Sequence, residues 1–287
     1  MRVLLLPVLL LLFACQSRPT LPVLPQLEEP GQIVDLQTGQ RLSPDELIAR
    51  LAAAPRVIVG EQHDHPDHHR LQLWLLQALA ARRPQGSLLL EMLTPEQQPK
   101  VDGLRQAMAK QGLPADLPKA LAWQPGWDWS LYGPIVSFAL VQPYPLWAAN
   151  LDRLEVRGIY AKAPVLSGSH ANAPSVRQAL LAQVRTSHCG LLPESQLPAM
   201  LAVQQQRDRR MAQRLLDAPT PALLFAGAFH ARKDVGVPVH LADLPPPRDA
   251  VVLMLAQRGA EVMPATADYV WYTAPMADKD YCAQLRQ

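Results

Sequence analysis

The sequence lacks the features that mark nucleic-acid-binding proteins and two large hydrolase classes. Charged residues make up only 18% of the 287 residues, aromatic residues 6%, and the net charge is +2 without a basic run. No nucleic-acid partner is therefore expected. The chain has no Gly-x-Ser-x-Gly elbow and no His-Glu-x-x-His motif, which disfavours serine-elbow and zincin hydrolases. Three cysteines are present, and proline is abundant at 29 residues.

The N-terminus carries the most specific signal. Arg2 precedes an apolar stretch over residues 4–13 that ends at Ala14 and Cys15, and this stretch is too short to span a bilayer. The pattern resembles a bacterial lipoprotein signal, which implies that residues 1–14 are removed and that Cys15 is lipidated. Gln16 after the cysteine favours the outer membrane over the inner one. The alternative is an ordinary cleaved signal with Cys15 present by chance.

The lipoprotein signal predicts a cell-envelope protein that is held at a membrane by its lipid anchor. Residues 15–31 are proline-rich and favour an extended tether, and residues 32–287 are expected to form a single domain. Export also places Cys189 and Cys282 in an oxidising compartment, where they can form a disulfide. Two buried thiols are the alternative.

Short continuous apolar runs, typical of strands buried on both faces, alternate along the chain with helical patterns. This order predicts an α/β fold with a mostly parallel central sheet and helices on both faces. The predicted strands lie at residues 57–59, 87–91, 145–150, 222–226, 250–254 and 269–272. The predicted helices lie at residues 68–82, 95–111, 132–141, 175–185 and 197–216, the last with a charged face at 207–210. Residues 112–130 form a smaller helical and loop insertion, whose tryptophans at positions 123, 127 and 129 line either an apolar pocket or a satellite core.

Polar residues follow several of the predicted strands directly. Glu61 and His63 follow the strand at 57–59, and His230 follows the strand at 222–226 in the same Gly-x-x-His pattern. Glu91 and Asn150 end two further strands. Because ligands bind beyond the carboxyl ends of parallel strands, these side chains are expected to meet in one crevice. A buried Glu91 would then need a histidine or arginine partner.

Four of the eight histidines lie within residues 63–69. Such clustering favours metal binding, proton transfer or ligation of a metal in a cofactor. For His65, His68 and His69 the alternative is a solvated polar loop that leads into a helix, with Asp67 as the helix cap.

These motifs resemble the ChaN family of haem-binding, iron-regulated lipoproteins. The resemblance runs in order from about residue 33 to 273, and its segments are residues 60–69 with Gln72, residues 91–92, 127–132, 150, 204–212, 227–232 and 236–238. It implies a protein that binds haem iron for uptake, that works near an outer-membrane haem receptor and that forms a homodimer. It also implies a superfamily with the erythromycin esterases and the TraB/Tiki proteins.

The resemblance suggests site residues for two functions. For haem, His63, His230 and Tyr132 are candidate ligands, together with the other histidines at positions 65, 68 and 69, and Arg232 and Lys233 are candidates for the propionates. The alternative function is a hydrolase. In one version His63 is the base, oriented by Glu61 or Glu91; in the other, His63 and His230 hold a divalent metal.

Overall fold

A computed structural model describes residues 21–29 and 31–283, so the predicted signal peptide and the lipidation site Cys15 lie outside the described residues. Within the described part, one eight-stranded sheet has the strand order β2-β1-β8-β7-β3-β6-β4-β5. β1 pairs antiparallel with β2 and β8, and all other neighbours are parallel. The strands are β1 (Gln32–Asp35), β2 (Arg41–Leu42), β3 (Arg56–Glu61), β4 (Ser87–Leu90), β5 (Leu146–Ala148), β6 (Ala222–Gly227), β7 (Val251–Gln257) and β8 (Tyr269–Thr273).

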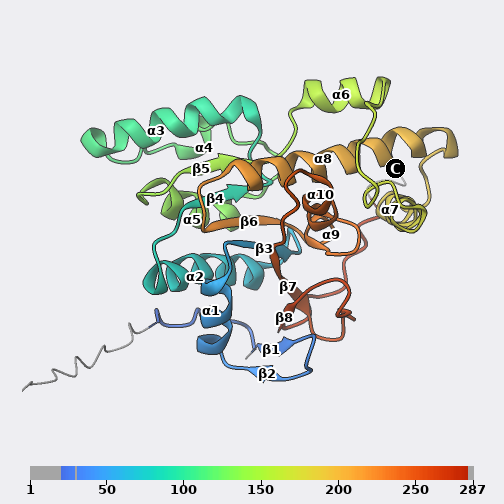
Figure 1. The fold of residues 1–287 in the computed structure, drawn as a ribbon. Coiled ribbons are helices and arrows are strands. Elements are labelled where there is room, and N and C mark those ends of the chain that lie inside the picture. Colours follow the sequence, from blue (N-terminus) through green and yellow to red (C-terminus); the bar gives the residue numbers. More distant parts are fainter. Residues whose placement is uncertain (1–20, 30, 284–287) are drawn as a thin grey trace, which may run out of the picture.

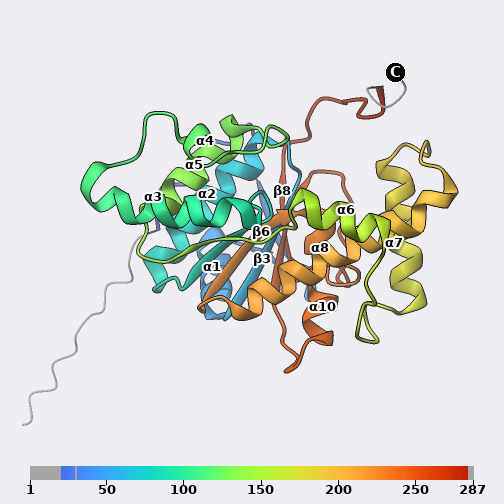
Figure 2. The same ribbon diagram turned by 90° about the horizontal axis from the view of Figure 1, so that it is seen from above.

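Helices cover both faces of this sheet (Figures 1 and 2). They are α1 (Pro44–Ala53), α2 (Pro66–Arg82), α3 (Gln98–Gln111), α4 (Leu117–Ala120), α5 (Trp129–Leu140), α6 (Arg153–Ala161), α7 (Pro174–Ser187), α8 (Leu197–Asp217), α9 (Ala228–Ala231) and α10 (Val237–Asp243). Two single-turn 3₁₀ helices, Pro95–Gln97 and Glu194–Gln196, precede α3 and α8. The predicted α/β architecture is confirmed. The predicted insertion at residues 112–130 contains the short helix α4 and the start of α5, and it lies between α3 and the rest of α5.

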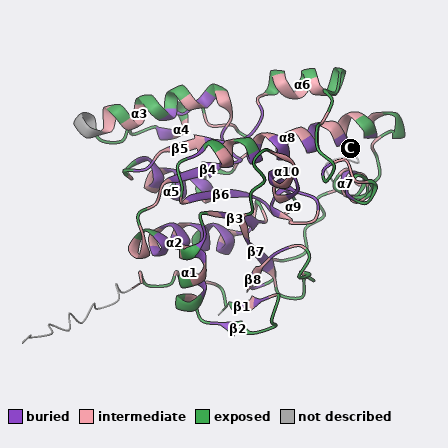
Figure 3. Cartoon of the chain, in the orientation of Figure 1, coloured by how far each residue is buried: buried purple, intermediate pink, exposed green. Residues whose placement is uncertain are grey.

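The alternation of side chains along β3 divides the core into two layers. Val57 and Val59 pack into a cluster with α1, α2 and α5, whereas Ile58 faces a cluster with α8 and α10. All three side chains are fully buried, and the central strands appear buried along their length in Figure 3. Burial on both faces explains why β3 reads as a continuous apolar run without a polar alternation.

Local capping sets the ends of several helices. Ser43 caps α1 in a reciprocal capping box with Glu46, and Asp152 caps α6 in the same way with Glu155. Thr94 is the N-cap of the 3₁₀ helix Pro95–Gln97 at the start of the predicted helix 95–111, and the Gln97 side chain accepts the Thr94 N–H. Each of these caps satisfies backbone N–H groups that the first turn of a helix leaves free.

The described part of the predicted tether contacts the domain. Leu21 and Leu27 pack against the first core cluster, the Pro22 carbonyl accepts a hydrogen bond from Trp74 Nε1, and the Glu28 N–H donates to the Asp67 side chain. Residues 21–29 are thus bound along α2. No helix in residues 21–29 and 31–283 is long and apolar enough to cross a membrane.

Candidate functional site

The site begins at the carboxyl end of β3. Parallel pairing places Glu61 directly beside Gly227 at the end of β6, so the two Gly-x-x-His segments leave the sheet together. Gly60 is required by close packing, since a Cβ there would lie 2.7 Å from Ala231 Cβ and from Met254 Sδ. The Glu61 side chain is completely buried, which makes its polar partners important for stability.

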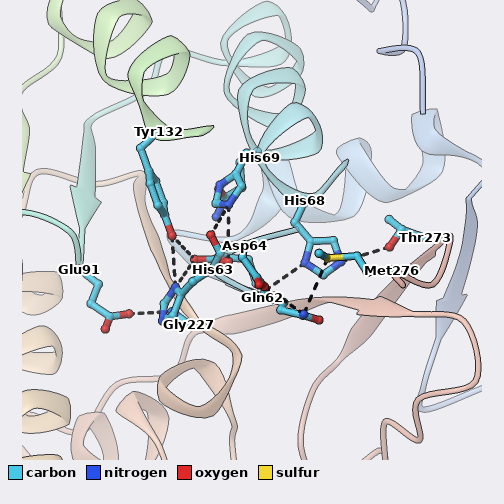
Figure 4. A network of polar contacts seen from close by, with 12 residues as sticks. Gln62, His63, Asp64, His68, His69, Glu91, Tyr132, Gly227, Thr273 and Met276 are labelled. Atoms are coloured by element: carbon cyan, nitrogen blue, oxygen red, sulfur yellow. Dashed lines mark hydrogen bonds and ion pairs between the residues drawn. The ribbon is translucent and has the colours of Figure 1, made fainter. Parts of the chain in front are cut away.

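Glu61, His63 and Tyr132 form one hydrogen-bonded group, and Figure 4 shows the Tyr132 hydroxyl turned towards His63. Glu61 Oε1 lies 2.7 Å from His63 Nδ1 and accepts a 2.8 Å hydrogen bond from the Tyr132 hydroxyl. Burial alone would lower the pKa of His63. The hydrogen bond and charge of Glu61, with the charges of Glu91 and Asp64, outweigh burial and raise this pKa to about 9. The imidazole is therefore protonated at neutral pH, and Nδ1 donates to Glu61.

A second group links Glu91, His230 and Asp208. His230 Nε2 lies 3.4 Å from Glu91 Oε1, and its Nδ1 lies 2.5 Å from Asp208 Oδ1. Burial disfavours the charged imidazole, but the two carboxylates outweigh burial and raise the pKa of His230. The His230 imidazole thus lies between two buried acids that favour its protonated form, and Glu91 has the histidine partner that the sequence predicts.

The two acids of this group differ in their environments. Burial would raise the pKa of Glu91, yet the positive charges of His230 and His63 and the Gly227 N–H hold it below its ordinary range. For Asp208, burial is the strongest influence and raises the pKa despite the charge of His230. The site thus joins an ionised Glu91 to a more readily protonated Asp208.

Gly227 connects the two groups. Its N–H donates a 2.7 Å hydrogen bond to Glu91 Oε2, and a Cβ at this position would lie only 2.7 Å from the imidazole of His63. The structure thus brings Glu61, His63, Glu91 and His230 to one edge of the sheet. Asn150 does not join them, because its side chain accepts the N–H of the next residue.

A cavity of about 1090 Å³, here called the site cavity, opens above these residues. Its floor is formed by the β3 and β6 ends, and its walls come from α6, α7 and α8 and from residue 281. The apolar lining residues are Val156, Val184, Met200, Val203, Ala228 and Phe229. The polar and aromatic ones are Glu61, Gln62, His63, Asp64, Tyr160, Gln183, Ser187, His188, Gln204, Arg207, His230, Gln257 and Tyr281.

Among the described residues, Arg207 is the arginine that lines this cavity. Its Nε atom is buried and has no hydrogen-bond partner in the described structure. The two cations named from the sequence lie elsewhere, since Arg232 is paired with Asp234 and Lys233 with Asp268. Neither of them lines the site cavity. Arg207 therefore replaces them as the candidate partner for a carboxylate of the ligand.

The other three histidines of residues 63–69 hold the loop in place rather than face the cavity. His68 Nδ1 accepts the Gln62 N–H, His69 Nε2 donates to the His63 carbonyl, and His65 Nε2 contacts the Ala274 carbonyl. Burial, with the neighbouring His65 and His69, lowers the pKa of His68 to about 2.

These three histidines are buried, so the alternative of a solvated loop is wrong. The predicted cap is also wrong, because α2 is capped at His65 rather than at Asp67. Asp67 instead accepts hydrogen bonds from Glu28 and Arg70.

The three tryptophans of the insertion pack against the core next to the site and do not face the cavity. Trp123 and Trp129 pack edge to face at 5.0 Å, and Trp127 packs against the His63 imidazole at 4.9 Å. All three contact the first core cluster and none lines the site cavity. This arrangement fits the satellite-core alternative. Tyr132 likewise lies behind the cavity, with its hydroxyl turned to Glu61.

Two contributors were missed in the sequence. The sequence predicts a charged helix face at residues 207–210, but the Asp208 side chain is fully buried against His230, and Arg209 is buried as well. The C-terminal tail, here residues 274–283, was not placed at the site. Tyr281 donates a 2.9 Å hydrogen bond to Asp64, and Lys279 forms a salt bridge with the same carboxylate.

The disulfide Cys189–Cys282 fixes this tail to the end of α7, with a Cα–Cα distance of 5.8 Å. It decides between the two alternatives left open for these cysteines. No group of three or more His, Cys, Asp or Glu side chains in the described residues has the arrangement of a metal site.

Comparison with protein families matches residues 47–241 to the family described as haem-binding uptake, Tiki superfamily, ChaN. Among solved structures, the chain resembles ChaN of Campylobacter jejuni, whose structure is described as cofacial heme binding. The two share 28% identity over 87% of this chain and 99% of that chain, with a TM-score of 0.79.

Two other solved structures are more distant. RRSP, a MARTX toxin effector domain from Vibrio vulnificus, shares 14% identity over 82% of this chain and 38% of that chain, with a TM-score of 0.44. An erythromycin esterase mutant, EreC, shares 14% identity over 86% of this chain and 83% of that chain, with a TM-score of 0.47. No curated protein matches the sequence.

Proposed function

The chain belongs to the haem-binding uptake family of the Tiki superfamily that includes ChaN, and we propose that it binds haem in the site cavity. The observation that carries this proposal is the composition of that cavity. Although many lining residues are polar, most of the surface that faces the cavity comes from apolar atoms; its volume is about 1090 Å³, and one arginine with an unpartnered buried nitrogen lines it. Ligand sites of this kind combine an apolar surface with a few oriented polar groups.

The cavity residues fit the parts of a haem group. Val184, Val203 and Phe229 offer apolar surface to a porphyrin, and Arg207 offers a guanidinium to a propionate. Bound haem would supply a redox-active iron centre, and the chain's own residues would hold the macrocycle and exclude water. Among the ligand candidates named from the sequence, only His63 and His230 line the cavity.

A haemin titration of the chain without residues 1–15 tests this proposal. Ser187 is exposed and lines the cavity, whereas its neighbour Thr186 is exposed and does not. We expect a saturable Soret band with the unmodified chain and with Thr186→Trp, and a strongly weakened one with Ser187→Trp. If the unmodified chain does not bind haemin, the proposed function is wrong. Equal binding by Ser187→Trp would place the haem elsewhere.

We further propose that the protein works in haem and iron uptake at the cell envelope, anchored by a lipid on Cys15 and located at the outer membrane. The support is the short apolar N-terminal stretch that ends at Cys15. An outer-membrane haem receptor as donor and a homodimer as the working form belong to the same proposal. Mass spectrometry of the protein from membranes tests it, since an unmodified N-terminus or an unmodified Cys15 would contradict it.

A hydrolase is the second candidate, and the two carboxylate–imidazole groups at one cavity favour it. With a pKa of about 9, His63 would act as an acid or as a charge that stabilises a transition state, rather than as the general base expected from the sequence. A panel of esters and peptides, assayed with the unmodified chain and with His230→Ala, tests this candidate. No turnover of any substrate by the unmodified chain would rule against it.

A further inference from the structure

A second cavity, here called the arginine cavity, lies along the C-terminal half of α8 and has a volume of about 800 Å³. It shares no lining residue with the site cavity, which contacts the N-terminal half of the same helix. Four arginines from three parts of the chain line it, together with a single carboxylate, Asp217. The arginines are Arg56, Arg210, Arg214 and Arg248.

Only one of these arginines is neutralised by an acid in the described part of the chain. Arg210 forms a salt bridge with Glu155. Neutral groups hold the other three: Arg56 Nε donates to the Leu215 carbonyl at 3.3 Å, and Arg214 Nε donates to the Ala148 carbonyl at 3.1 Å. The Arg248 guanidinium donates to the carbonyl of the preceding residue.

The carbonyl contacts restrain Arg56 and Arg214, whereas Arg248 is exposed. In the described part of the chain none of the three has a salt bridge, and Arg214 is attracted only by the more distant charges of Asp217 and Asp102. The Arg214 guanidinium also lies 4.2 Å from the centre of the Trp147 ring, which restrains its orientation. Burial lowers the pKa of Arg56, and the positive charge of Arg248 lowers it further. Like charges gathered around one cavity repel each other, and an anion bound between them would remove that cost.

We propose that the arginine cavity binds a phosphoryl group, with Arg56, Arg214 and Arg248 as its ligands. A phosphoryl dianion matches several convergent guanidiniums better than one carboxylate does, because each planar fork can donate two hydrogen bonds to its oxygens. The rest of the cavity wall is suited to an organic portion of the ligand. It includes Leu216, Leu244, Pro245 and Pro246.

Thermal unfolding with pyrophosphate tests the proposal, with potassium chloride of equal ionic strength as the reference. The chain without residues 1–15 is compared with Arg248→Gln and with the control Arg41→Gln, an exposed arginine on β2 at the far edge of the sheet. We expect a saturable rise of the Tm with pyrophosphate for the unmodified chain and the control. We expect roughly tenfold or greater weakening of binding for Arg248→Gln.

The Tm measured without pyrophosphate shows whether Arg248 stabilises the fold or serves to bind an anion. If the arginines exist for an anion, Arg248→Gln without pyrophosphate should keep or raise the Tm, because it removes a repulsive charge. Flotation with phosphatidic acid vesicles, compared with phosphatidylcholine vesicles, distinguishes a lipid headgroup from a soluble phosphate as the source. The proposal is overturned if neither phosphate form binds beyond its reference, or if Arg248→Gln and Arg41→Gln bind equally.

Discussion

Tyr132 and Tyr144 are both buried, yet only the Tyr132 hydroxyl has a hydrogen-bond partner. Tyr132 donates to Glu61, whereas the Tyr144 hydroxyl has no partner among the described residues. Tyr132→Phe should lower the free energy of unfolding by about 1–3 kcal/mol, because it leaves the buried carboxylate of Glu61 with one donor fewer. Chemical denaturation measures this, with Tyr144→Phe as the matched control that should be nearly neutral. Equal effects of the two changes would contradict the role given to Tyr132.

The raised pKa of His63 makes stability depend on pH in a defined window. The folded-state pKa is about 9 and the ordinary value is 6.5, so the Glu61–His63 pair stabilises the fold fully below about pH 6.5. That contribution is lost as the pH rises through about 9. The His63 side chain is 44% exposed, and solvent screening should limit the effect to about 1 kcal/mol or less.

Urea unfolding of the unmodified chain and of His63→Gln at pH 6 and pH 9.5 tests this linkage. The stability advantage of the unmodified chain over the variant should be larger at pH 6. An advantage that grows with pH would contradict the protonated imidazole.

Gly227 is predicted to control the position of His63. A methyl group on Gly227 would lie 2.7 Å from the imidazole, so Gly227→Ala should push the ring away from Glu61 and lower the pKa of His63 towards 6.5. Titration of the histidine ring signals by NMR measures this. In the control Gly103→Ala the new methyl group meets no atom within 4 Å, and the His63 pKa should stay near 9.

At the scale of elements, the C-terminal tail depends on its disulfide. Cys189–Cys282 closes a segment of 93 residues, and it holds Tyr281 and Lys279 against Asp64. Reduction should release the end of this tail, residues 279–283, because the contacts of Lys279 and Tyr281 with Asp64 are at the surface and contribute little each.

Trypsin cleavage after Lys279, followed by mass spectrometry, measures the release of the tail. Cleavage should accelerate several-fold under reducing conditions, while cleavage after the exposed Lys162 serves as the internal reference. Equal acceleration at both residues would indicate general unfolding instead of tail release.

The central strands and the edge strand β5 could be predicted from sequence, whereas β1 and β2 at the other edge could not. β3 and β6 are continuous apolar runs bounded by glycine, so their ends and the polar residues that follow them were predictable. β1 and β2 have four and two residues, too few for a periodic pattern. Helices α1, α6, α9 and α10 were also missed. The short helix α9 contains His230, and α10 follows it after five residues.

The candidate site was predictable only in part, because strand ends can be recognised in the sequence whereas the packing of a helix face cannot. Glu61, His63, Glu91 and His230 end strands, where the parallel sheet gathers them. Asp208 lies in the middle of α8 between arginines, and in sequence this is indistinguishable from a solvated charged face. Its burial follows from how α8 packs on the sheet beside β6 and α10, which is a tertiary property. The contacts of Tyr281 with Asp64 likewise join residues 217 positions apart.

At the scale of the whole molecule, the two cavities along α8 differ in the kind of ligand that they suit. The site cavity is mostly apolar with one arginine, whereas the arginine cavity is strongly cationic. The arginines of the second cavity would attract the propionates of haem. The proposed function requires the first, where the paired imidazoles and carboxylates of β3, β4 and β6 meet.

Anomalous diffraction at the iron absorption edge, from crystals of the haemin-loaded chain, tests that requirement directly. The account predicts an iron peak inside the site cavity, between α8 and the carboxyl ends of β3 and β6. An iron peak among Arg56, Arg214 and Arg248, or at the surface away from both cavities, would contradict it.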